Sequence, residues 1–127
     1  MKRVTGLGGF FIKSKNPTKL EAWYRKHLGL PMQFGAWSFA WRDSQHPSRK
    51  GFTVISLFES RSGYFRPSKK PFMFNFRVDN LRRLLTQLRK EGVKVDRRIV
   101  ESDEGRFGWI IDAEGNRIEL WEPRKGK

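Results

Sequence analysis

Residues 108–123 read GWIIDAEGNRIELWEP, two apolar runs joined by a polar segment. The Gly-Asn pair at 115–116 suits the positive φ angles of a short hairpin turn. Successive side chains of a strand point to opposite faces, so Glu119 shares a face with Arg117 and Trp121. This stretch therefore predicts a β-hairpin that carries one carboxylate among basic and aromatic side chains.

The segment before this hairpin predicts a strand, a helix and a further strand. Residues 72–78 form an aromatic strand, Asp79 or Asn80 can cap a helix that ends before Gly92, and residues 94–100 are again strand-like. Leucines at helical spacing give that helix one apolar stripe: Leu81, Leu84, Leu85 and Leu88. Residues 72–123 thus have the order strand, helix, three strands.

The first half of the chain repeats this plan. An apolar strand at 7–12 is followed by a helix that begins at Asn16 and Pro17 and ends at Gly29. Strands at 34–42 and 51–59 come next, and a third strand-like stretch, beginning as early as Pro31, is left open. A basic connector at 60–71 contains Gly63, Pro67 and Pro71. We expect one domain over residues 1–127, with a first module at 7–59 and a second at 72–123.

The composition narrows the class of protein. The chain has 127 residues, enough for one domain, and no cysteine, which excludes disulfides and thiolate metal sites. No apolar run reaches the length of a membrane span, so we expect a cytoplasmic protein without membrane contact. The net charge of +14 favours anionic partners and disfavours cationic ligands.

Two short patterns accompany the closing hairpin. The first is Leu20-x-x-Trp23-Tyr24-x-x-x-Leu28-Gly29-Leu30, and the second combines Val78-Asp79-Asn80-Leu81 with Leu88-x-x-x-Gly92-Val93. Together with residues 108–123, their order and spacing resemble the glyoxalase/bleomycin-resistance/dioxygenase (vicinal oxygen chelate) superfamily, over about residues 7–123. The resemblance implies an α+β fold of two βαβββ modules, whose curved mixed sheets face each other around a ligand cavity. It also implies a homodimer.

Metal-using members of this superfamily place one ligand on the first strand and one on the last strand of each module. On this sequence the four positions fall near Gly9, Ser56 and Met73 and at Glu119. Only Glu119 is a good ligand for a divalent ion, because glycine has no ligating side chain and Ser and Met are poor ligands. We therefore expect no metal and no cofactor. If a metal site exists, Glu119 is its ligand, and the ion is Ni, Zn, Mn or Fe.

Without a metal, Glu119 is the candidate catalytic base. A carboxylate that faces the cavity must be paired or have a raised pKa, and Arg77 is a candidate partner. Such a group can take a proton next to a carbonyl as a general base. The alternative is a carboxylate that a neighbouring Arg merely neutralises.

The other side chains expected to bind ligand are aromatic, polar or basic: Phe11, Phe39, Trp41, Ser56, Phe58, Met73, Asn75, Arg77, Trp109, Arg117 and Trp121. An aromatic cavity with Arg and Glu at its base suits a flat or partly apolar ligand with an anionic group. The first interpretation is thus a binding protein for a small, anionic or aromatic molecule. The second is a metal-dependent lyase, isomerase or dioxygenase that uses Glu119. The third, nucleic-acid binding through the basic surface, has only the composition in its favour, and we expect no nucleic-acid partner.

Overall fold

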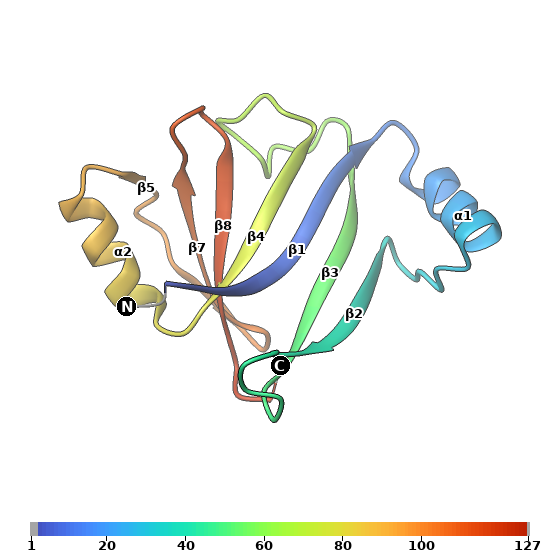
Figure 1. The fold of residues 1–127 in the computed structure, drawn as a ribbon. Coiled ribbons are helices and arrows are strands. Elements are labelled where there is room, and N and C mark those ends of the chain that lie inside the picture. The colour runs from blue at the N-terminus through green and yellow to red at the C-terminus, as the bar shows by residue number, and fades with distance from the viewer. Residues whose placement is uncertain (1–2, 127) are drawn as a thin grey trace.

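The computed structural model describes residues 3–126. Its apolar and aromatic strands form one curved sheet, accompanied by two helices (Figure 1). The first half contains β1 (Val4–Ser14), α1 (Pro17–Leu28), β2 (Ala36–Arg42) and β3 (Lys50–Glu59). The second half contains β4 (Phe72–Val78), α2 (Leu81–Lys90), β5 (Lys94–Val95), β6 (Val100–Ser102), β7 (Gly105–Ile111) and β8 (Arg117–Pro123).

The strands form a single mixed sheet of eight strands, in the order β2-β3-β1-β4-β8-β7-β5, with β6 pairing with β7. The antiparallel pair of β1 and β4 joins the two halves at the centre of the sheet (Figure 1). Within each half, the first strand lies parallel to the last one, β1 to β3 and β4 to β8. The predicted α+β architecture with curved mixed sheets is confirmed.

Both helices begin and end where the sequence predicts. The Asn16 side chain accepts a hydrogen bond from the Lys19 amide, and Gly29 follows α1 in the left-handed conformation. At α2 the cap is Asn80, which accepts from the Arg83 amide. A capping side chain satisfies a backbone N–H that the helix itself leaves unpaired, which is why polar residues of this kind mark helix starts.

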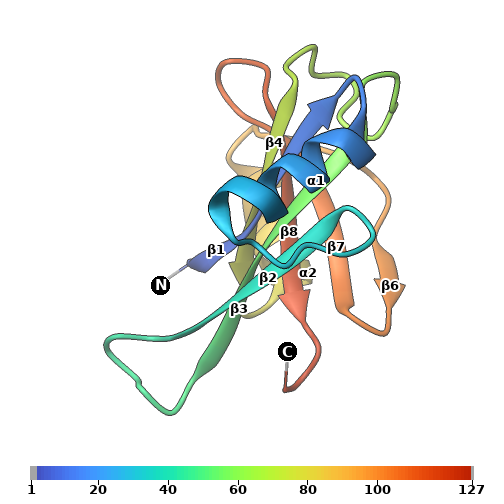
Figure 2. The same ribbon diagram turned by 90° about the vertical axis from the view of Figure 1, so that its right-hand side faces the viewer.

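The two helices differ in how they pack. Leucines of α2 are buried with strand residues in the larger core cluster: Val78, Leu81, Leu84, Leu85, Ile118 and Leu120. No residue of α1 is buried, and Trp23 of its predicted apolar stripe is 50% exposed. Figure 2, with α1 in front, shows this helix at the outer side of β1, β2 and β3. Among residues 3–126, neither helix is long and apolar enough to cross a lipid bilayer.

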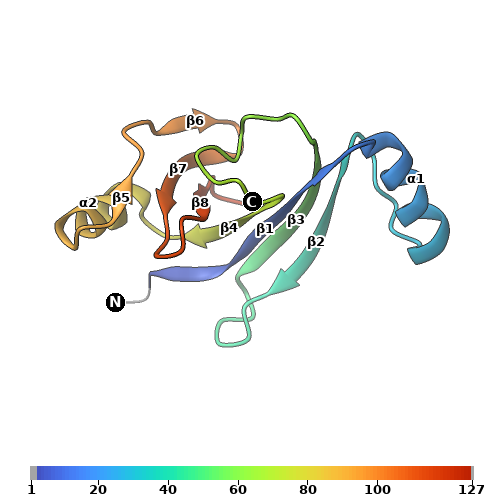
Figure 3. The same ribbon diagram turned by 90° about the horizontal axis from the view of Figure 1, so that it is seen from above.

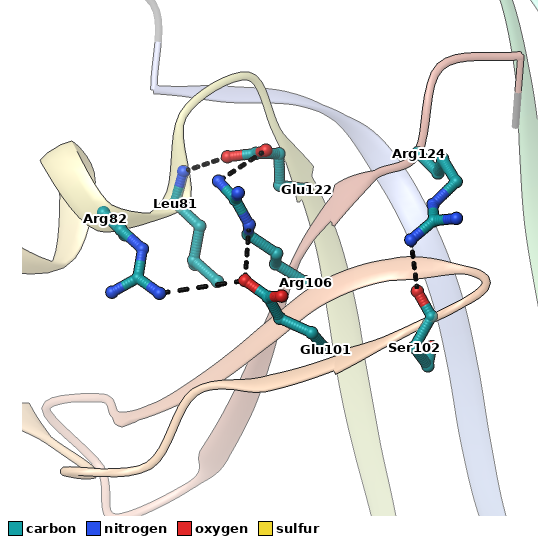
Figure 4. A network of polar contacts seen from close by, with 7 residues as sticks. All are labelled: Leu81, Arg82, Glu101, Ser102, Arg106, Glu122 and Arg124. Atoms are coloured by element: carbon teal, nitrogen blue, oxygen red, sulfur yellow. Dashed lines mark hydrogen bonds and ion pairs between the residues drawn. The ribbon is translucent and has the colours of Figure 1, made fainter.

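A polar network fixes the start of α2 to the sheet (Figure 4). The Leu81 amide donates to Glu122 Oε1 at 2.9 Å, so a β8 carboxylate satisfies a free N–H of the first helical turn. Arg106 bridges Glu122, at 3.5 Å, and Glu101, at 2.9 Å. The network thus joins the start of α2 to β6, β7 and β8.

The third strand-like stretch of the first half does not become a strand. Gln33 forms only an isolated bridge with Ala36, through two backbone hydrogen bonds of 3.0 Å. The two residues between them, Phe34 and Gly35, have φ angles of 53° and 80°. They form a two-residue turn of the kind that joins hairpin strands. Before Gln33 the chain no longer pairs with β2, since the Met32 amide donates to the Leu30 carbonyl and the Met32 carbonyl accepts from Arg25.

Candidate functional site

One row of residues crosses the centre of the sheet at the level of Glu119. Pairing places Asn75 opposite Glu119, Gly9 opposite Asn75, and Val54 opposite Gly9. The sequence-based positions near Ser56 and Met73 therefore stand two residues from this row. A β-bulge between Leu7 and Gly9 disturbs the alternation, and such an irregularity cannot be counted from the sequence.

Glu119 is 2% exposed and accepts three hydrogen bonds from neutral side chains. Asn75 Nδ2 donates to Oε1 at 2.6 Å, and Trp109 Nε1 donates to Oε2 at 2.9 Å. The Tyr64 hydroxyl also donates to Oε2. Both carboxylate oxygens are thus engaged by donors, and no oxygen is left facing an open cavity.

The electrostatics of Glu119 follow from this burial. Burial raises the pKa of Glu119 above its ordinary value of 4.5, while the three hydrogen bonds and the Arg117 charge oppose the rise. Burial and the neighbouring Glu119 also raise the pKa of Tyr64, so its hydroxyl remains a donor at neutral pH. Glu119 is thus a buried acid surrounded by three uncharged hydrogen-bond donors.

The connector at 60–71 supplies the part of the site that sequence analysis missed. Seen from above, this segment lies inside the curve of the sheet (Figure 3). Tyr64 reaches Glu119, and Phe65, with no exposed surface, packs against Phe11 and Met73. Tyr64 and Phe65 are adjacent aromatic residues in an otherwise polar, basic connector. That contrast was the available signal that this segment folds onto the sheet.

Two of the aromatic residues that were expected to line an open cavity, Phe11 and Phe58, are packed together with the connector instead. Phe11 and Met73 lie in the buried cluster with Phe65, and the Phe58 ring is 5.5 Å from Phe11 and 5.4 Å from Tyr64. The chain thereby fills much of the concave side with its own connector. Ser56 pairs with Phe11 in the ladder and is partly buried.

A second group of predicted residues meets in a neighbouring row, where Arg77 pairs with Trp121 two residues beyond Asn75 and Glu119. The Arg77 guanidinium, expected beside Glu119, lies 4.8 Å from the Trp121 ring and 5.5 Å from the Trp41 ring. Burial lowers the pKa of Arg77, and its Nη1 reaches the Phe52 carbonyl at 3.5 Å. Phe39, in contrast, is 43% exposed on β2, away from both groups.

A cleft of about 500 Å³ opens beside Tyr64 and Trp109. Its lining combines arginine, aromatic and small side chains: Gly63, Tyr64, Arg66, Arg98, Val100, Ser102, Phe107, Trp109 and Arg117. The guanidinium carbons of Arg117 and Arg98 lie 5.0 and 5.8 Å from the Trp109 ring centre. The cleft therefore offers flat apolar surfaces next to positive charge, with Glu119 covered beneath Tyr64 and Trp109.

The superfamily's divalent metal does not fit the residues of the Glu119 row. Gly9 and Val54 have no ligating atoms, and Asn75 turns its N–H group, not its oxygen, to Glu119. The hydrogens of three donors point at the carboxylate oxygens, where a cation would have to bind. Within the part of the chain that the structure describes, no three His, Asp or Glu side chains gather into a metal-binding group.

Comparisons with known proteins support the fold. No protein-family model matches the sequence, and no curated protein matches it. Methylmalonyl-CoA epimerase from Mycobacterium tuberculosis is similar, with a TM-score of 0.63 and 23% identity over 98% of this chain and 91% of that one. A Streptomyces coelicolor methylmalonyl-CoA epimerase variant, in complex with 2-nitronate-propionyl-CoA, has a TM-score of 0.69 and 15% identity over 94% and 98%.

A third structure carries a different activity on the same architecture. A Legionella pneumophila protein described as an NAD-dependent benzaldehyde dehydrogenase has a TM-score of 0.59 and 14% identity over 91% of this chain and 98% of that one. At these identities the similarity establishes the architecture, and the chemistry must be argued from the site. The chain has the fold of the glyoxalase/bleomycin-resistance/dioxygenase (vicinal oxygen chelate) superfamily, as its sequence patterns predicted.

Proposed function

We propose that the protein binds a small, anionic ligand with a flat apolar part, without a metal, in the cleft beside Tyr64 and Trp109. The observation that carries this proposal is the lining of that cleft, in which three arginines surround three aromatic rings. Aromatic faces bind flat apolar groups, and guanidinium groups bind carboxylate or phosphate through paired hydrogen bonds.

The balance of charge in the cleft favours an anion. Asp96 lies 3.6 Å from Arg117 and 3.7 Å from Arg98 and offsets part of their charge. Arg66 makes no ion pair with any other residue of 3–126, and the whole chain carries +14. The ligand named for the Streptomyces epimerase structure, 2-nitronate-propionyl-CoA, is itself an anion. This ligand class is consistent with the cleft.

An enzyme that uses Glu119 as its base is the second candidate. The raised pKa of Glu119 and the epimerase neighbours favour it. The three donors that cover the Glu119 carboxylate argue against this enzyme. A general base needs a free lone pair within hydrogen-bond reach of the substrate proton. A lyase, isomerase or dioxygenase of this kind would require Tyr64 to leave Glu119, with or without a metal.

The test is to titrate the protein with 2-naphthoate and to measure binding by Trp fluorescence and by calorimetry. Uncharged 2-naphthalenemethanol is the matched control probe, and coenzyme A is a larger anion. We expect 2-naphthoate to bind and the uncharged probe to bind at least about tenfold more weakly, the loss expected for one charge-assisted pair. Arg66→Gln and Arg98→Gln should each weaken 2-naphthoate binding, whereas Arg83→Gln on the exposed face of α2 should not.

Two results would contradict the proposed function. One is the absence of binding by both anions, and the other is binding that both cleft variants leave unchanged. Turnover of a bound acid or thioester that Glu119→Gln abolishes would favour the enzyme instead, since binding alone does not need the carboxylate.

A further inference from the structure

The outer edge of β2 is the place where the two halves of the sheet differ most. In the second half, β5 and β6 pair with β7 on the side away from β8. In the first half, the corresponding position beside β2 holds only the single bridge of Gln33 to Ala36. Figure 1 shows β2 as the last strand on this side. From Trp37 onward, no strand within residues 3–126 pairs with this edge.

The hydrogen-bond pattern identifies which backbone groups stand open at this edge. The N–H and C=O of Ala36 both bond to Gln33, so the backbone of Ala36 points outward from the sheet. In an antiparallel ladder this direction alternates from residue to residue. Ser38 and Ala40 therefore also point their N–H and C=O groups outward, and their small side chains do not shield these groups.

The sequence of this strand lacks the features that keep edges unpaired. Residues 36–41 read AWSFAW, with no charge and no proline, and the charge that β2 does carry, Arg42, is at its last residue. Natural edge strands are commonly protected by lysine, proline or bulges. Trp37 and Phe39 are 36% and 43% exposed, and the adjacent Phe34, in its strained turn, is fully exposed. A neutral, aromatic edge in a chain of charge +14 is also where two copies can approach with least repulsion.

From these observations we infer that the protein forms a two-fold dimer in which β2 pairs antiparallel with the same strand of a second copy. A two-fold axis beside Phe39 brings Ser38 opposite the partner's Ala40, and every outward N–H and C=O of these residues then has a partner. Phe39 faces the partner's Phe39 across a non-hydrogen-bonded pair, and Trp37 faces the partner's Trp41. The strand is thus complementary to itself.

The size of this contact sets its strength. An aromatic side chain has a surface of about 150–250 Å². Multiplied by the exposed fractions of Phe34, Trp37 and Phe39, this gives roughly 400 Å² of exposed aromatic surface per copy. The paired backbone brings this closer to the roughly 800 Å² per partner of a standard interface. Contacts at this small end of the range are typical of weak, transient association, so we expect a dissociation constant on the order of micromolar.

The first experiment measures mass by sedimentation across protein concentrations on both sides of that constant. The wild-type chain of 15.0 kDa should shift to twice that mass as its concentration rises. Ala40→Pro removes an outward N–H that is not bonded to β3, so the variant should keep the fold. The dimer loses one hydrogen bond from each copy, and the dissociation constant should rise at least about tenfold. Val4→Lys, at an exposed site on β1, is the control and should leave the dimer unchanged.

The second experiment does not depend on how Ala40→Pro folds. The chain has no cysteine, so Phe39→Cys introduces a single thiol. Cα atoms of a non-hydrogen-bonded antiparallel pair lie about 4.5 Å apart, within the range of a disulfide. Mild oxidation should therefore link Phe39→Cys chains in pairs. Phe34→Cys, more exposed but away from the two-fold axis, should link much less.

Three outcomes would overturn the inference. They are a mass of one chain at every concentration, a dimer in which Phe34→Cys links more readily than Phe39→Cys, and an open-ended series of larger assemblies. The cleft lies on the other half of the sheet, so Arg66→Gln and Arg98→Gln should leave the dimer unchanged. Failure of the dimer and failure of the proposed ligand binding can thus be told apart.

Discussion

The Tyr64 hydroxyl donates a hydrogen bond to the buried Glu119 carboxylate across 55 residues of sequence. This contact ties the connector between β3 and β4 to the last strand of the sheet. It also covers the one acidic side chain of the central row. The connector is therefore part of the site.

Tyr64→Phe removes the hydroxyl donor and keeps the ring that stacks on Phe58. We expect the free energy of unfolding to fall by about 1.5–3 kcal/mol, the usual value of a hydrogen bond to a charged group. Urea unfolding measures it. Tyr24→Phe is the matched control, because Tyr24 lies on the loosely packed α1, and its change should stay within about 0.5 kcal/mol. Equal losses in the two variants would contradict this role of Tyr64.

Stability should depend on pH through Glu119. Its pKa is raised in the folded state above the ordinary 4.5, so the folded protein holds this proton more tightly than the unfolded chain does. As pH rises from about 4.5 through the raised pKa, the unfolding free energy of the wild type should therefore fall relative to Glu119→Gln, which cannot ionise. Denaturant unfolding across this range measures the difference.

An exposed carboxylate, Glu91, provides a control in which the unfolding free energy should depend on pH in the opposite direction. The hydrogen bond from Arg3 lowers the pKa of Glu91 to about 2. Its stabilising contribution is present above about pH 4.5 and is lost as pH falls toward 2, the reverse of the Glu119 effect. Salt should screen the Glu91 effect far more than the Glu119 effect, because Arg3 and Glu91 are exposed. Parallel pH curves for Glu119→Gln and Glu91→Gln would contradict both assignments.

Phe65→Ala should open the concave side of the sheet. Phe65 has no exposed surface, and its loss from the cluster with Phe11 and Met73 should lower the unfolding free energy by about 3–5 kcal/mol. The apolar cavity left behind should bind benzene, detected as a rise in melting temperature on adding it. Leu28→Ala, at a site 59% exposed on α1, should change neither quantity.

Metal content should distinguish the binding protein from a metalloenzyme. We expect purified protein incubated with Ni, Zn, Mn or Fe(II) and then desalted to retain far less than one ion per chain. The reason is that donors occupy the carboxylate oxygens of Glu119 and its row offers no other strong ligand. Mass spectrometry of the metal content measures this. Retention of one ion per chain, lost in Glu119→Ala, would restore the metal-dependent alternative.

Much of the fold could be predicted because its signals are local. Asn16, Asn80 and Gly29 mark helix ends through contacts within one turn, and the Gly-Asn pair at 115–116 specifies a hairpin through its own backbone angles. The alternation around Glu119 likewise follows from the geometry of a single strand. Physical rules that span a few residues suffice for these features.

The contents of the site depended on contacts between distant segments. The pairing of Gly9 with Asn75 follows a bulge in β1, the docking of Tyr64 spans 55 residues, and the outer edge of β2 has only the single bridge of Gln33 to Ala36. The sequence by itself determined both helices, the long strands, the superfamily architecture and the strand that carries Glu119, but not the third strand-like stretch of the first half or the division of residues 94–100 between β5 and β6. Only the tertiary structure decided that the connector covers this carboxylate, because side-chain packing, unlike hydrophobic periodicity, is not encoded within any one segment.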